Sequence, residues 1–207
     1  MPPRQGIFGG TFDPPHVGHV AAAVSARDQL GIATLCVAVA NDPWQKSERR
    51  SVTPAHHRFE MTRLAFEAVD GIEVTDIELR RGGPTFTIET VIDLERPGTE
   101  TVLVVGPEAA AGLGAWNRAD ELACRVTVGI LQPPGHEFGH LDGWKTMPIV
   151  MAPVDASATR VRELLAAAAR EPARGSHDAV ADAMREAARM VPDAVMSYIA
   201  DRGLYSA

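Results

Sequence analysis

The sequence predicts an α/β fold in which a doubly wound parallel sheet carries a helical carboxyl-terminal piece. Short apolar runs rich in β-branched residues alternate with segments of helical period, and a Gly-Gly pair directly follows the first run. From residue 157 onward the pattern is helical. Because 207 residues are the length of one domain, we expect a core at 1–156 and a helical subdomain at 157–207 within one continuous domain.

The positions of the individual elements follow from the same patterns. Apolar runs predict strands at 5–8, 35–40, 72–79, 101–105, 126–131 and 149–152. A first helix is indicated by helical spacing of Val17, Val20, Val24 and Leu30. Further helices are expected at 59–68, 88–94, 161–165, 179–190 and 195–199. Gly and Pro clusters predict loops at 82–84, 97–98, 133–135 and 172–175.

The composition argues against nucleic acid and membrane surfaces as partners. The chain has 27 acidic and 20 basic residues, a formal net charge of −7, and therefore no uniform basic field to attract a polyanion. Any phosphate-bearing partner must be bound locally. Without a cationic leader or a long apolar stretch, we expect a cytoplasmic protein. Cys36 and Cys124 lie in apolar runs that predict core strands, so neither a disulfide framework nor a Cys-based zinc site is expected.

The strongest functional signal is the string GGTFDPPHVGH at 9–19, at the first strand-to-helix junction. Gly9 and Gly10 let backbone N–H groups approach an anion, and the following helix directs the positive end of its dipole to the same place. His16 and His19 are three residues apart, so both can donate hydrogen bonds to phosphate oxygens. A zinc half-site is the alternative, but no acidic or Cys ligand follows nearby. The string therefore predicts a phosphate site.

A second anion site is predicted where the carboxyl-terminal helices begin. Ser157 is a favourable N-cap, which leaves N–H groups available at the helix start, and Thr159 and Arg162 follow within one turn. Taken alone, the pattern also describes a capped amphipathic helix with a solvated arginine. Lys46 is one of only two lysines in the chain. It is either a compact charge for a phosphate or a surface residue.

These motifs resemble those of the His-x-Gly-His nucleotidyltransferase superfamily, and within it those of the bacterial nicotinate mononucleotide adenylyltransferases. The resemblance implies a Rossmann-like fold and transfer of AMP from ATP to nicotinate mononucleotide, which gives nicotinate adenine dinucleotide and pyrophosphate. It covers nearly the whole chain in family order: GGTFDPPHVGH at 9–19, PWQK at 43–46, His57-Arg58-x-x-Met61, GGPTFTIET at 82–90, Trp116, SATRVR at 157–162, and the end from Val191 to Tyr205.

The resemblance also implies roles for individual residues. The catalytic residues would be His16, His19, Lys46 and Arg162. ATP would be bound by Gly9, Gly10, Thr11, Phe12, His16, His19, Gly106, Glu108, Ser157, Thr159 and Arg162. The pyridine mononucleotide would be bound by Trp44, Lys46, Arg58, Thr85, Phe86, Thr87 and Trp116. The two tryptophans are candidates to stack on rings, although tryptophan is more often part of a core. Amide groups at 85–87 could recognise a carboxylate and so select nicotinate over nicotinamide.

The expected mechanism needs no enzyme nucleophile, because the substrate phosphate is already ionised at neutral pH. The protein aligns that phosphate with the α-phosphorus of ATP and neutralises charge as pyrophosphate leaves. We expect Mg²⁺ as the cofactor, carried by the ATP phosphates, because no carboxylate cluster predicts a protein-bound metal. Apolar positions at 179–190 could pack on the body of the protein or on a second copy, so assembly into a homo-oligomer is one of the possibilities that the sequence allows.

Two departures from the family pattern bear on the phosphate acceptor. Glu108 stands where the family usually has Asp, and Pro133 stands where it usually has Arg. They leave open a related transferase that uses nicotinamide mononucleotide, phosphopantetheine or another acceptor, or CTP as the donor. A non-catalytic nucleotide-binding module would carry a damaged His-x-Gly-His motif, and here the motif is intact. A class I aminoacyl-tRNA synthetase fragment would need a Lys-Met-Ser-Lys-Ser-like loop, which the chain lacks.

Overall fold

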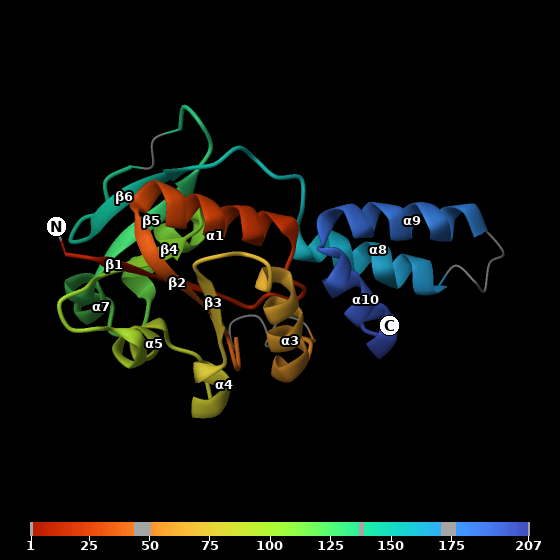
Figure 1. The fold of residues 1–207 in the computed structure, drawn as a ribbon, viewed down its shortest axis with the longest axis horizontal. Helices are drawn as coiled ribbons and strands as arrows, with labels where there is room; N and C mark the ends of the chain where they lie inside the picture. The colour runs from red at the N-terminus through yellow and green to blue at the C-terminus, as the bar shows by residue number, and fades with distance from the viewer. Residues whose placement is uncertain (1, 44–50, 137–138, 171–176, 207) are drawn as a thin grey trace.

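A six-stranded, wholly parallel sheet forms the centre of the protein, as the sequence predicts (Figure 1). The computed structural model describes residues 2–43, 51–136, 139–170 and 177–206. The strand order is β3-β2-β1-β4-β5-β6, so the direction of winding reverses between β1 and β4. The strands are β1 Arg4–Gly10, β2 Ile32–Val39, β3 Ile72–Thr75, β4 Glu100–Val105, β5 Val126–Gln132 and β6 Lys145–Val150.

Helices cover both faces of the sheet, and each face has its own apolar core. The parallel strands are buried on both faces, and successive side chains of β4 alternate between the two cores: Val102 and Val104 belong to one, Leu103 and Val105 to the other. The helices are α1 Val17–Leu30, α3 Ala55–Phe66, α4 Ile77–Arg81, α5 Thr87–Leu94, α6 Pro107–Ala111, α7 Ala119–Arg125, α8 Ala158–Arg170, α9 His177–Met190 and α10 Asp193–Arg202, with a 3₁₀ turn at Leu113–Ala115.

The register places the ends of three strands at one edge of the sheet. Gly10 of β1 pairs with Val39 of β2, and Phe8 of β1 pairs with Val104 of β4. In doubly wound sheets, ligands bind outside the carboxyl ends of the strands, where the winding reverses. The loops that follow β1, β2 and β4 therefore surround the position where a ligand is expected.

The carboxyl-terminal helices add to the first core rather than building a separate one. Val161 of α8, Ala187 of α9 and Val195 of α10 are buried in the same cluster as Phe8 and Val37. Figure 1 shows α8 and α9 side by side at one end of the molecule, with α10 next to α3. Within the described ranges, no helix has both the length and the apolar character needed to cross a membrane.

One predicted strand is wrong in its second half. The apolar alternation at 72–79 predicts a single strand, but β3 ends at Thr75 and α4 begins at Ile77. The Thr75 hydroxyl accepts the Ile77 N–H at 3.3 Å, and Asp76 forms an i,i+4 ion pair with Arg80 at 2.9 Å. Both contacts favour a helical turn. The last strand is displaced as well, since β6 begins at Lys145 rather than at residue 149.

The first helix is confirmed, but one further expectation about the core is wrong. The valines of α1 are only partly buried, and the helix presents Ala22, Ala23, Ala26 and Leu30 to the core. Small side chains let the helix lie close to the sheet, so burial follows alanine rather than the larger apolar residues. Cys36 is buried in β2 as expected, but Cys124 lies in α7 and is exposed. Its apolar run belongs to the end of a helix and the start of β5.

Candidate active site

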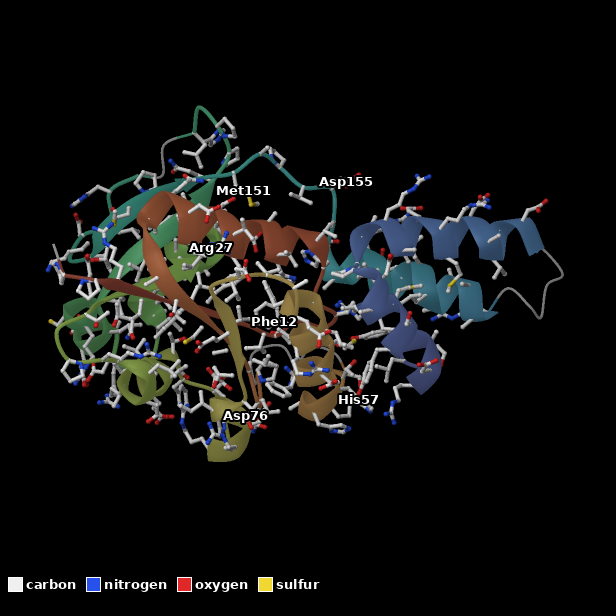
Figure 2. All side chains as sticks on the ribbon, in the orientation of Figure 1. Phe12, Arg27, His57, Asp76, Met151 and Asp155 are labelled. Atoms are coloured by element: carbon white, nitrogen blue, oxygen red, sulfur yellow. The ribbon has the colours of Figure 1, made fainter. Side chains whose placement is uncertain are left out.

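The loop between β1 and α1 is shaped by two glycines and one buried aromatic ring. Phe12 has a φ of 49°, and its ring is 2% exposed; it lies deep in the molecule near α3 (Figure 2). A Cβ on Gly10 would lie 2.7 Å from that ring, so Gly10 must be glycine. A Cβ on Gly9 would meet nothing within 4 Å. The backbone at Gly9 therefore faces open space that a ligand can enter.

The two histidines of the loop are held against each other in a defined orientation. Their ring centroids are 3.7 Å apart, and the edge of Phe12 packs on His19 at 4.9 Å. The backbone N–H of His16 donates to Nδ1 of His19 at 3.2 Å. Because Nδ1 accepts, the proton of neutral His19 resides on Nε2, which becomes a hydrogen-bond donor.

Steric contact with His16 explains why a glycine lies between the two histidines. A Cβ on Gly18 would lie 3.0 Å from Cε1 and Nδ1 of His16. Any side chain there would push the His16 ring out of place. The spacing of the His-x-Gly-His motif thus follows from packing as well as from chemistry.

His16 is electrostatically unusual. Burial lowers the pKa of His16 from its usual 6.5 to about 4, so the ring is neutral at physiological pH. Its Nδ1 is buried and faces the backbone N–H of His19 in a capping-box arrangement, without a hydrogen bond of ordinary geometry among the described residues. A neutral atom can be left in this state, because burying an uncharged polar group costs far less than burying a charge.

The second predicted anion site joins the first. Ser157 caps α8, since its Oγ accepts the backbone N–H of Arg160 at 3.1 Å. Arg162 then reaches across to the β1–α1 loop, where Nη1 donates to the carbonyl oxygen of Asp13 at 2.7 Å and Nη2 to Oγ1 of Thr159 at 3.1 Å. Two motifs about 150 residues apart in sequence therefore meet at one place.

A pocket of about 390 Å³ opens beside this loop. Thr85, Phe86, Thr87 and Trp116, all predicted to contact the pyridine nucleotide, line it together with Gly10 and Thr11. The lining residues that sequence reasoning missed are Ala40, Pro43, Ala115 and Asn117. Their positions could have predicted them, because each residue either follows β2 or flanks Trp116. Their side chains are of types that do not by themselves indicate a binding site.

The loop that contains Thr85 is fixed by the end of β2. Asn41 donates through Nδ2 to Gly83 O at 2.9 Å, and through its backbone N–H to Oγ1 of Thr85 at 3.1 Å. The N–H of Thr85 donates to Asp42 O at 3.2 Å. That amide is therefore engaged by the protein, contrary to the expectation that it recognises a carboxylate. The first two amides of α5, those of Thr87 and Ile88, have no intrahelical acceptor and are better placed to recognise a carboxylate, because the next two donate to Phe86 O.

Arg58 has a different role from the one that the motif implied. Its side chain is 1% exposed, whereas a substrate contact needs an accessible guanidinium. The guanidinium instead donates to four backbone carbonyl oxygens at 2.6 to 2.9 Å, those of Thr11, Ala40, Asn41 and Thr53. Arg58 is thus a positioning residue that ties together the loops after β1 and β2.

The remaining predicted residues are less closely associated with the pocket. Gly106 ends β4 as the N-cap of α6, and a Cβ on it would meet nothing within 4 Å. Glu108 follows in the first turn and is exposed. Trp44 and Lys46 lie outside the described residues. Among the residues that are described, His, Cys, Asp and Glu side chains form no group of three that could hold a metal ion.

Comparison with known proteins finds similarity to nicotinate-nucleotide adenylyltransferases. The family model described as cytidylyltransferase-like matches residues 7–164. A probable nicotinate-nucleotide adenylyltransferase of Corynebacterium kroppenstedtii is 34% identical over 210 residues, with 98% of this chain and 91% of the relative covered. The corresponding protein of Gemmatimonas aurantiaca is also 34% identical, over 98% of this chain and 92% of its own length.

Solved structures support the fold. A Plasmodium falciparum nicotinic acid mononucleotide adenylyltransferase complexed with NaAD superposes with a TM-score of 0.71 at 17% identity. The match covers 98% of this chain and 97% of that one. The same enzyme complexed with APC gives a TM-score of 0.71 at 16% identity, over the same shares of the two chains.

The role of Arg58 can be tested by separating stability from substrate binding. Arg58→Met leaves four carbonyl oxygens without their Arg58 donors, two in buried and two in partly buried contacts. The free energy of unfolding, measured by urea denaturation, should therefore fall by about 3 kcal/mol or more. Arg63→Met, on the same helix, removes only exposed ion pairs and should cost less than about 1 kcal/mol. If Arg58→Met leaves the urea midpoint unchanged but raises the KM for the pyridine nucleotide, Arg58 contacts the substrate after all.

The neutral state of His16 predicts a pH dependence of stability. Since the folded pKa of His16 is about 4 and the unfolded value is 6.5, the unfolded chain binds the proton first. The free energy of unfolding should therefore decrease as pH falls from about 6.5 to about 4, by up to roughly 3 kcal/mol from this residue. In urea denaturation, the free energy of unfolding of His16→Gln should fall less than that of the wild type as the pH is lowered from about 6.5 to about 4. Equal losses in the two proteins would contradict a buried neutral imidazole.

Proposed function

The chain belongs to the cytidylyltransferase-like family and, within it, to the nicotinate-nucleotide adenylyltransferases, and we propose that it transfers AMP from ATP to nicotinate mononucleotide. The products are nicotinate adenine dinucleotide and pyrophosphate, so the reaction serves NAD biosynthesis. This is a nucleotidyl transfer between two phosphates. The observation that carries the proposal is the meeting of both anion motifs at Asp13, beside a pocket of about 390 Å³ that Trp116 lines.

The geometry accounts for charge stabilisation without an enzyme nucleophile. A phosphate oxygen of the mononucleotide forms a bond to the α-phosphorus of ATP, and the bond from that phosphorus to the bridging oxygen of pyrophosphate breaks. Nε2 of His19 donates to the charge that develops on the phosphate oxygens, and the amides at Gly9 and Gly10 add to it. Thr159 and Arg162 hold the departing pyrophosphate. Lys46 stays a predicted contact to the phosphates.

Mg²⁺ fits this site only as an ion carried by the substrate. The groups around the loop are two imidazoles, backbone N–H groups, a guanidinium and the Asp13 carboxylate, which is buried against Tyr205. Among the described residues they form no group of three side chains that could hold a metal ion. ATP phosphates and water would therefore supply the ligands of Mg²⁺. Its contribution is to neutralise charge on the phosphate oxygens.

The pocket beside the loop suits the pyridine ring and its substituent. Trp116 offers a ring face, and the first amides of α5 offer donors to a carboxylate. The amide donors favour nicotinate over nicotinamide, since the amide of nicotinamide carries no negative charge. Placement of the enzyme in the cytoplasm and assembly into a homo-oligomer stay predictions.

Pyrophosphate release, measured with Mg²⁺, is the direct test. ATP and CTP are offered as donors, each with nicotinate mononucleotide, nicotinamide mononucleotide or phosphopantetheine. We expect release with ATP and nicotinate mononucleotide, and a lower kcat/KM with nicotinamide mononucleotide. Activity only with phosphopantetheine or only with CTP would overturn the proposal in favour of the alternatives that Glu108 and Pro133 suggest. Silence with every pair would indicate a non-catalytic module.

The role of His19 predicts a specific kinetic defect. His19→Ala removes a donor that acts on charge developing in the transition state, so kcat should fall roughly a hundredfold or more while both KM values change little. His140→Ala is the matched control, because His140 is exposed and lies outside the pocket. A kcat for His19→Ala equal to that of the control would remove His19 from the mechanism.

A further inference from the structure

The end of the chain returns to the loop that carries the histidines. Tyr205 follows α10, and its hydroxyl donates to Oδ1 of Asp13 at 2.8 Å, across 192 residues of sequence. The Asp13 side chain is only 2% exposed. A buried carboxylate is expensive unless it is paired or hydrogen-bonded, so this contact is a strong one.

Asp13 is held at both its side chain and its main chain. While Tyr205 donates to the carboxylate, Arg162 donates to the carbonyl oxygen of the same residue at 2.7 Å. Asp13 lies three residues before His16 and three after Gly10. A shift of Asp13 would therefore move the histidine pair, whereas Gly9 and Gly10 are held in the sheet by their pairing with β2.

The conformation of Tyr205 is itself unusual. Its φ is 63°, in the left-handed region that residues with a side chain rarely adopt. Such a conformation persists only where the surroundings hold it. Here Leu204 N–H donates to Ile199 O at 3.1 Å, and the side chains of Leu204 and Tyr205 both pack on the first core.

The hydroxyl of Tyr205 retains its proton over the working pH range. Burial, together with the nearby charge of Asp13, raises the pKa of Tyr205 well above its usual value. The hydroxyl of Thr53 and the guanidinium of Arg162 act in the opposite direction, but burial dominates. Tyr205 is thus a permanent donor, and its contact with Asp13 does not switch with pH.

We propose that Tyr205 is a positioning residue for catalysis, which holds Asp13 so that the His16–His19 pair faces the reacting phosphates. This inference rests on the function proposed above. It gives the segment that follows α10 a role at the active site. The pocket around Trp116 is built independently, from the ends of β2 and the start of α5.

The test compares the only two tyrosines of the chain. Tyr205→Phe removes the hydroxyl that reaches Asp13. Tyr198→Phe is the matched control: its hydroxyl also joins the carboxyl-terminal helices to the body, at 2.9 Å from Nδ1 of His57, but it is remote from the loop (His57 is labelled in Figure 2). Pyrophosphate release from ATP and nicotinate mononucleotide is measured with Mg²⁺, below the melting temperature of each variant.

For Tyr205→Phe we expect kcat to fall roughly tenfold or more, with the KM for nicotinate mononucleotide within about twofold of the wild type. Tyr198→Phe should keep the wild-type kcat. A lower melting temperature for Tyr205→Phe with an unchanged kcat would show a purely structural contact and overturn the inference. An inactive wild type would instead refute the proposed function, so the two failures are distinguishable.

A double-mutant cycle tests whether Tyr205 acts through Asp13. In an Asp13→Ala background the acceptor of the Tyr205 hydroxyl is gone, so adding Tyr205→Phe should change kcat by less than about threefold. A further tenfold loss in that background would overturn the inference. If Tyr205→Phe alone does not fold, the comparison of Asp13→Ala with the double variant decides the question, because neither protein carries the Asp13 carboxylate.

Discussion

One buried guanidinium holds the edge of the sheet on which the site is built. Arg58, on α3, binds the backbone carbonyls that follow β1 and β2 as well as the segment that leads into its own helix. The carbonyls of Thr11, Ala40 and Asn41 lie just beyond the strand ends, where the sheet ladder no longer supplies donors, and they would otherwise need water. Because guanidinium offers five donors in a planar fork, one side chain satisfies several of them together. Asn41, fixed in this way, then fixes the loop that contains Thr85.

Phosphate recognition in an acidic chain depends on backbone groups more than on net charge. A net charge of −7 gives no long-range attraction for ATP. In the proposed function the attraction is short-ranged and comes from N–H groups at the starts of α1 and α8, from the imidazoles of His16 and His19 and from Arg162. A neutral His16 fits this logic, since a donor can stabilise developing charge without the desolvation cost of a buried cation.

The fold and the main motif were predictable because both depend on local patterns. The alternation of apolar runs with helical segments predicts the number of strands and the arrangement of helices on both faces of the sheet. The glycines and histidines at 9–19 follow β1, the strand at which the winding reverses. Arg58 was misjudged because a motif records that a residue is present, not whether its side chain faces substrate or backbone. The error at 72–79 has a similar cause: Ile77 and Leu79 alternate as in a strand, while the turn depends on hydrogen bonds at Thr75 and Asp76. Alanine burial in α1 depends on the distance between helix and sheet, which periodicity does not contain.

Among the buried polar groups of the β1–α1 loop, the Asp13 carboxylate and Nδ1 of His16 are treated differently by the structure, and the difference follows from their charge. The Asp13 carboxylate would be too costly to leave unpaired, and the chain brings Tyr205 from its far end to pair it. His16 Nδ1 is neutral, so leaving it unsatisfied within the described structure costs far less. The charged group is therefore used to fix the loop, whereas the neutral one needs no such partner. This division lets the loop be rigid before ATP arrives, which spares the substrate the entropic cost of ordering it.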